Sequence, residues 1–137
     1  MSTETSAGAI IFRKEQGIVN YLLLQYKAGH WDYVKGHMEK GEDEITTTKR
    51  ECQEETGITD LNFIPGFRHE IRFFFRRDND TVSKTVYFYL AETKTKEIRL
   101  TEHIGYDWFT YEEAMKKVTF KDSRELLRKA NEIVTKL

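Results

Sequence analysis

The chain crowds negative charge into the end of one predicted helix. We expect this helix to begin at Asp43, to continue through RECQEET at residues 50–56 and to stop at Gly57, a usual position for glycine. Its last turn and a half carries three carboxylates, those of Glu51, Glu54 and Glu55. Their mutual repulsion costs roughly 0.2–0.5 kcal/mol per pair, and the negative end of the helix dipole adds about 0.3–1 kcal/mol for each. Arg50 offers one local cation, so the cluster predicts a bound divalent metal ion. The open alternative is a solvated charged face.

The composition favours a single globular domain over residues 1–137. Hydrophobic residues make up 39% of the chain, which is enough for a real core. The net charge of −1 gives no long-range field, so we expect a local phosphate site and neither a stable nucleic-acid complex nor membrane binding. One cysteine excludes an internal disulfide framework, and the N-terminus lacks a signal-peptide pattern. We therefore expect a cytoplasmic protein; the oligomeric state is left open, with a monomer favoured.

Alternating and β-rich segments predict a sheet with helices on its faces. The strand candidates are residues 7–13, 19–26, 67–77, 83–92, 98–100 and 106–109, with turns at residues 14–17 and 78–80. Residues 27–42 read as a loop rich in glycine and charge. Thr110 and Glu113 form a capping box, and apolar residues at helical spacing after Asp122 predict an amphipathic closing helix. Mixed strands and helices indicate an α+β or α/β sandwich.

Three further residues precede the acidic cluster at fixed intervals. Glu42 lies six residues after Gly36 and eight before Arg50. The segment over residues 36–58 resembles the Nudix box, the loop-helix-loop signature of hydrolases that cut nucleoside diphosphates linked to another moiety. All seven fixed residue types of that signature are present over 23 consecutive residues. The resemblance implies one Nudix domain of the α/β class, an α/β/α sandwich in which helices flank a mixed central sheet.

The chemistry of the segment agrees with this resemblance. Hard carboxylate oxygens favour Mg²⁺ or Mn²⁺, which also bind phosphate oxygens. The expected ligands are Glu51, Glu54 and Glu55. Gly36 is expected to let the backbone approach the metal or the substrate without a side chain in the way. Arg50 is expected to orient the glutamates by charge-assisted hydrogen bonds. Glu42 is expected either to hold Arg50 or to join the metal shell through water.

The strand over residues 67–77 carries an aromatic side chain among charges. Side chains alternate between the two faces of a strand, which puts Phe74 on the same face as Arg72 and Arg76. A base that stacks on this ring would have guanidinium groups beside its phosphates. Two alternatives stay open: a bulge that reverses the faces, or packing of Phe74 on a neighbouring loop.

Segments outside the box narrow the resemblance. SAGAIIFRK, KTVYFYLAE and LTEH look like the asymmetric diadenosine tetraphosphate hydrolase branch of the Nudix family. In that branch two aromatic rings, often tyrosines, clamp one adenine, and the matching positions here are Phe74 and Phe120, which lack the hydroxyl group. The resemblance also implies a polyphosphate path along His30, Lys35 and Lys84. The prolines that usually precede this lysine are absent before Lys35, which leaves its placement less constrained.

The branch has an additional loop carboxylate, which matches Glu102. The resemblance implies that Glu102 binds a metal ion or acts as the general base, with one of the box glutamates as the other choice for that base. The implied reaction is the metal-dependent cleavage of diadenosine tetraphosphate into ATP and AMP by attack of water on phosphorus. Two alternatives remain: a Nudix enzyme for ADP-ribose, nucleoside triphosphates or RNA 5′ ends, and a nucleotide sensor without turnover.

Overall fold

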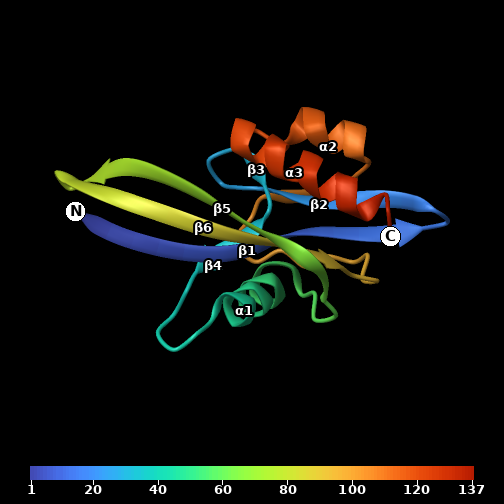
Figure 1. The fold of residues 1–137 in the computed structure, drawn as a ribbon, viewed down its shortest axis with the longest axis horizontal. Coiled ribbons are helices and arrows are strands. Elements are labelled where there is room, and N and C mark those ends of the chain that lie inside the picture. The colour runs from blue at the N-terminus through green and yellow to red at the C-terminus, as the bar shows by residue number, and fades with distance from the viewer.

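A mixed seven-stranded sheet lies between one helix on one face and two helices on the other in the computed structural model of residues 1–137 (Figure 1). The elements are β1 (Ser2–Glu15), β2 (Ile18–Gln25), β3 (Trp31–Asp32), β4 (Val34–His37), α1 (Glu44–Thr56), β5 (Asn62–Arg77), β6 (Asp80–Glu92), β7 (Gly105–Phe109), α2 (Tyr111–Lys117) and α3 (Lys121–Val134). The main strand order is β3-β2-β1-β6-β5, while β4 pairs with β1 and β7 with β2. Only β1 and β6 run parallel. The expected α/β/α sandwich is confirmed.

Strand alternation divides the core into two layers. Ile10 and Phe12 of β1 point into the larger cluster, which packs against α2 and α3. Ala9 and Ile11 point into the smaller cluster on the α1 side. The same alternation in β4 sends Val34 towards α1 and Tyr33, just before it, towards α3. Consecutive residues of one strand therefore serve different faces of the protein.

Three strands extend beyond the helices at one end of the sheet (Figure 1). This projecting end consists of the start of β1, the end of β5 and the start of β6, and its register pairs Phe73 with Lys84 and Phe74 with Ser83. Phe67 is buried, whereas the even-numbered residues from Arg68 to Arg76, Phe74 among them, are exposed. The N-terminus lies at the projecting end and the C-terminus at the opposite end.

The caps of the predicted helices are confirmed. The Asp43 side chain accepts a hydrogen bond from the N–H of Thr46 at the start of α1, and Gly57 ends the helix at φ 80°. Thr110 and Glu113 form both bonds of the capping box. No helix combines the length and apolar character required to cross a bilayer.

Two parts of the chain differ from the sequence-based expectation. Residues 27–42 contain β3 and β4, which are too short to show a periodic pattern. The strand predicted over residues 98–100 is wrong: Ile98 and Leu100 pack against the smaller core cluster, but the segment joins no sheet. Its backbone is held instead by the N–H of Arg99, which donates to the Thr56 carbonyl at 2.9 Å.

The core beneath α3 gives a stability prediction. Leu127 is completely buried there, so Leu127→Ala should lower the free energy of unfolding by about 2–5 kcal/mol. The matched control is Leu137→Ala, because Leu137 is 59% exposed and should change stability by less than about 0.5 kcal/mol. Urea denaturation measures both. Equal losses in the two variants would contradict the packing described here.

Candidate active site

Strand β4 and helix α1 meet at Gly36. A Cβ atom added to Gly36 would lie 1.9 Å from Cδ of Glu51, far inside van der Waals contact. The φ angle of Gly36 is not positive, so close approach and not backbone conformation requires glycine here. The first predicted position of the box thus lies directly against one of its glutamates.

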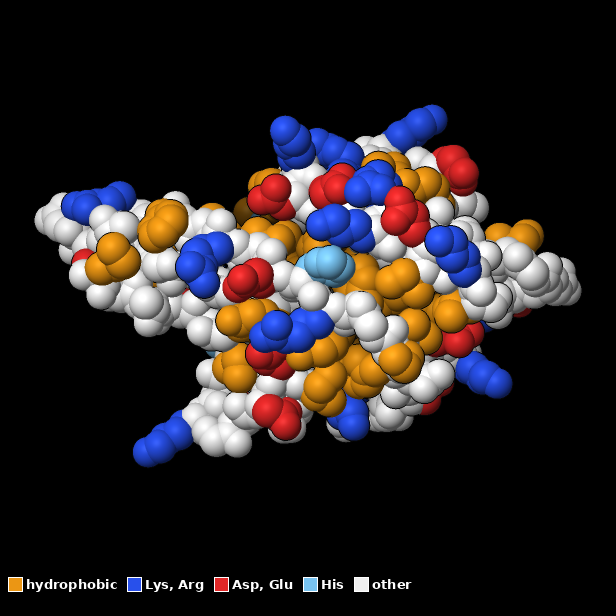
Figure 2. Space-filling model, in the orientation of Figure 1, with side chains coloured by type: hydrophobic (Ala, Val, Ile, Leu, Met, Phe, Trp, Pro, Cys, Tyr) orange, Lys and Arg blue, Asp and Glu red, His pale blue; other side chains and the backbone are white.

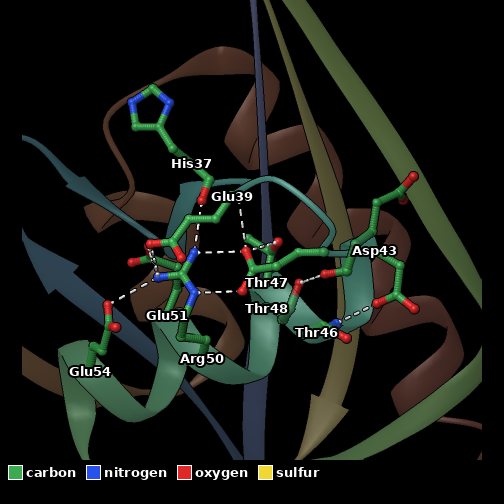
Figure 3. Close-up of polar contacts among 11 residues, drawn as sticks. His37, Glu39, Asp43, Thr46, Thr47, Thr48, Arg50, Glu51 and Glu54 are labelled. Carbon is green, nitrogen blue, oxygen red and sulfur yellow. Dashed lines mark hydrogen bonds and ion pairs between the residues drawn. The ribbon is translucent and has the colours of Figure 1, made fainter.

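Arg50 is the centre of a charged network on the exposed side of α1 (Figure 3). Its Nε and Nη2 donate to the two carboxylate oxygens of Glu42 at 2.7 and 3.0 Å. Its Nη1 donates to Glu51 at 2.8 Å and to Glu54 at 3.2 Å, and Nη2 also reaches the His37 carbonyl. The hydrogen bonds from Arg50, chief among the causes, lower the pKa of Glu42 to about 2. Of the two roles left open for Glu42, the structure shows it holding Arg50.

Glu55 lies on the side of α1 that packs on the sheet. It is 5% exposed, and neither of its carboxylate oxygens has a hydrogen-bond partner. His103 Nε2 is 3.4 Å from Glu55 Oε1, and burial lowers the pKa of His103. Burial raises the pKa of the Glu55 carboxyl well above its ordinary range, and the neighbouring Glu51 raises it further. A buried carboxylate without a donor costs several kcal/mol unless a cation approaches it.

A cavity of about 430 Å³ opens over these carboxylates. Its walls include Gly36 and the carboxylates of Glu51, Glu54, Glu55 and Glu102. We call it the carboxylate cavity. This set of hard oxygen donors, together with the unpartnered oxygens of Glu55, fits a divalent cation. In the present side-chain positions no three such groups converge on one point; Arg50 engages Glu51 and Glu54 instead.

A second cavity of about 250 Å³ lies on the α3 face of the sheet. Its lining is mostly apolar and includes Ile71, Phe73, Val86, Phe88 and Phe120. We call it the aromatic cavity. Lys35 borders both cavities. It lies in β4 directly before Gly36, which lines the carboxylate cavity. Its ammonium group lies 3.4 Å from the buried carboxylate of Asp32.

A row of rings runs from one cavity to the other. The Phe120 ring lies 5.2 Å from His30, and His30 stacks on Tyr26 at 4.6 Å. Tyr26 in turn meets the edge of His103 at 4.4 Å. Tyr26 was not singled out in the sequence because it reads as the end of a strand, and the row depends on the fold of residues 26–30.

The structure separates two residues that were expected to act together. Phe74 and Phe120 do not face each other, because Phe74 and Arg72 lie on the α1 face of β5 while Phe120 opens onto the α3 face. Phe73 lines the aromatic cavity with Phe120. In the run of three phenylalanines, the ring that shares a cavity with Phe120 is thus one residue before the expected Phe74. Lys84, the register partner of Phe73, lies on the cavity side, and burial lowers its pKa.

The fold and the box define a class, and comparison with known proteins agrees. The NUDIX domain model matches residues 3–130, so the chain belongs to the Nudix family. Members of this family generally use divalent metal ions.

The chain is 37% identical over 142 residues to the asymmetrical bis(5′-nucleosyl)-tetraphosphatase of Mus musculus, covering 94% of both chains. Identity to the enzyme of that name from Caenorhabditis elegans is 35%, covering 90% and 91%. Among solved structures, a binary complex of the C. elegans Ap4A hydrolase superposes with a TM-score of 0.80 at 29% identity, covering 98% of this chain and 99% of that one.

The unpartnered Glu55 carboxylate leads to a prediction about metal binding. Saturating Mg²⁺ or Mn²⁺ should raise Tm by roughly 5 °C or more, since binding at 100 times Kd stabilises a protein by about 2.7 kcal/mol. Glu55→Gln should lose most of this increase. The control is Glu97→Gln, because Glu97 is exposed and makes no ion pair, and it should keep the full increase. Differential scanning calorimetry measures both; the same increase in the two variants would exclude Glu55 as a ligand.

Proposed function

We propose that this protein is a hydrolase that cleaves diadenosine tetraphosphate asymmetrically, into ATP and AMP, with Mg²⁺ or Mn²⁺ as its cofactor. The observation that supports this most directly is the pair of adjoining cavities, one lined by aromatic rings and one by carboxylates, with Lys35 on the border. Such an arrangement suits a ligand with a base at one end and a polyphosphate chain. The names of the relatives point to the same substrate.

The aromatic cavity is the proposed site for one adenosine. A base stacks well on aromatic faces, at about 1–3 kcal/mol per base, and Phe73 and Phe120 present two such faces. The Phe73 and Phe120 side chains are 42% and 47% exposed, so a bound base would cover apolar surface of both rings. Neither ring has a hydroxyl group, so they offer stacking without hydrogen bonds.

Cationic and neutral donors mark the path from the base to the carboxylates. Lys35 and Lys84 provide ammonium groups for phosphate oxygens, and His30 lies beside Phe120 at the start of the path. The distance between the stacked base and the carboxylates then selects which phosphorus is attacked. Because only one adenosine is held in an aromatic cavity, cleavage is asymmetric.

The carboxylates of Glu51, Glu54 and Glu55 would hold the divalent cation, with Gly36 allowing close approach of the backbone. When bound, the cation would neutralise charge on the phosphate oxygens and favour ionisation of water. Arg50 positions Glu51 and Glu54 through its hydrogen bonds. Glu102 is exposed at the same cavity and makes no hydrogen bond, which leaves its carboxylate free to bind the cation or to accept the proton of the attacking water.

Product analysis tests the reaction itself. With diadenosine tetraphosphate and Mg²⁺ in ¹⁸O-labelled water, we expect ATP and AMP in equal amounts and one labelled oxygen in one of the two products. Glu55→Gln should lower kcat by more than about 100-fold, since even the outer-shell partners of metal ligands contribute roughly 10–100-fold. Glu97→Gln is the control. Two molecules of ADP as products would contradict asymmetric cleavage. Faster turnover of ADP-ribose, nucleoside triphosphates or capped RNA in the same assay would identify a different Nudix substrate.

The aromatic cavity gives a second prediction, about KM. Phe73→Ala should raise KM for diadenosine tetraphosphate by about tenfold or more, because a stacked base is lost. Phe74→Ala removes the same side chain from the other face of β5 and should leave KM within about twofold of the natural enzyme. Steady-state kinetics with both variants decides between the two rings. A larger effect at Phe74 would restore the residue first expected from the sequence.

A further inference from the structure

The α1-side face of the projecting end carries a second group of aromatic and basic side chains that the active site does not use. We define the projecting face by its side chains from three strands: Arg72, Phe74 and Arg76 of β5, Thr81, Ser83 and Thr85 of β6, and Thr3 and Thr5 of β1. Although the net charge of the chain gave no reason to expect a nucleic-acid complex, we propose that this face binds single-stranded nucleic acid, with one base stacked on Phe74 and the phosphates on either side of it at Arg72 and Arg76.

Phe74 and its two neighbouring arginines line neither cavity. Phe73 and Phe74 are consecutive in β5, so the sheet itself lies between Phe74 and the aromatic cavity. The register places Gly36, Ala7, Tyr87 and Glu70 in one row across four strands. At 4.7–4.9 Å per strand, Glu70 lies roughly 14 Å from Gly36, and Phe74 is about 13 Å further along β5. A base on Phe74 therefore lies well away from Gly36. The near wall of the carboxylate cavity, at His37 and Glu39, flanks Met38, whose N–H donates to the Thr5 carbonyl at the β1 border of the projecting face.

The arginines are held in place without being neutralised. Arg72 Nε donates to Thr85 Oγ1 at 3.3 Å, and Arg76 donates to Thr81 Oγ1 at 2.8 Å and to the Asn79 carbonyl at 2.9 Å. Arg76 makes no ion pair, and Arg72 has only an exposed contact with Glu70 at 3.7 Å, a type worth little. Each guanidinium keeps further N–H groups free for a phosphate.

Phe74 gives the face its preference for a base. The ring is 61% exposed and stands between the two arginines, two residues from each along the strand. Its register partner is Ser83, and the neighbouring positions of β1 and β6 are hydroxyl residues, so a flat base can lie over the ring without meeting a bulky side chain. Figure 2 shows hydrophobic side chains beside Lys and Arg side chains along this projecting end. Open sheets with an exposed aromatic ring and basic residues are a common platform for unpaired bases.

The symmetry of the site favours an internal nucleotide over a mononucleotide. A nucleotide within a strand has a phosphate on both sides of its base, and Phe74 has an arginine on both sides. A free nucleoside monophosphate would use one arginine and leave the other unpaired. An acidic peptide would satisfy the arginines but would leave the exposed ring of Phe74 without a stacking partner.

The test is a binding titration on the full chain in EDTA, so that no hydrolysis interferes. The probe is octauridylate with a free 5′ hydroxyl and a 3′ fluorescein, followed by anisotropy. Phe74→Ala should weaken binding about tenfold, while Phe73→Ala on the opposite face should bind like the natural protein. Arg72→Gln and Arg76→Gln should each reduce the slope of log K against log salt by about 0.7. Lys14→Gln, the same charge change at the other end of β1, should not.

Four outcomes would overturn the proposal. These are absence of saturable binding, equal loss in Phe73→Ala and Phe74→Ala, displacement of the probe by diadenosine tetraphosphate, and equal binding of a polyglutamate peptide of the same charge. The test is independent of the proposed hydrolase activity. The titration measures binding without turnover, so it gives a result even if the protein is inactive as a hydrolase. If the protein is active, Phe74→Ala should retain full cleavage of the dinucleotide.

Discussion

The burial of Glu55 is the constraint on which the site depends. Helix α1 packs on the sheet through Thr48, Cys52 and Glu55, which share one face at spacings of three and four residues. Helical geometry thus places a carboxylate where packing normally requires an apolar side chain. Both of its oxygens lack a donor, and the one basic side chain within 4 Å is that of His103, an imidazole whose pKa is lowered by burial. When the Glu55 carboxylate is ionised, no Lys or Arg side chain of the protein balances its charge.

Arg50 explains why Glu55 lacks a counter-charge while the other carboxylates of the helix have one. It is turned towards the exposed side of α1, where it engages Glu42, Glu51 and Glu54 (Figure 3). It makes no hydrogen bond or ion pair with Glu55. Outside the cluster, Lys35 lies on the border of the two cavities, and Lys84 lies on the aromatic-cavity side of β6. A polyphosphate chain that leads from the aromatic cavity to the carboxylates would pass Lys35.

Spacing and local chemistry were enough to predict much of the structure. The box, the caps of α1 and α2, the long β5–β6 hairpin and the two faces of β5 follow from sequence patterns that extend over one or a few turns. Other features depend on contacts between distant segments. The short strands β3 and β4 exist because they pair with β2 and β1. Alternation separated Phe73 from Phe74, but which of the two meets Phe120 is decided by where α3 packs.

The free edge of β5 offers a simpler reason for some of its charges. Long unpaired edges tend to associate with other strands, and Arg72, Arg76 and the bulge between Phe63 and Arg68 all oppose such pairing. Edge protection, however, is served by any charged side chain and is weakened by an exposed phenylalanine. Lysine at both positions would protect the edge without bonding to Thr85 and Thr81 as planar guanidinium groups do. Protection of the edge does not explain the exposed ring of Phe74 or the fixed orientation of Arg72 and Arg76. Binding of a stacked nucleotide requires both features.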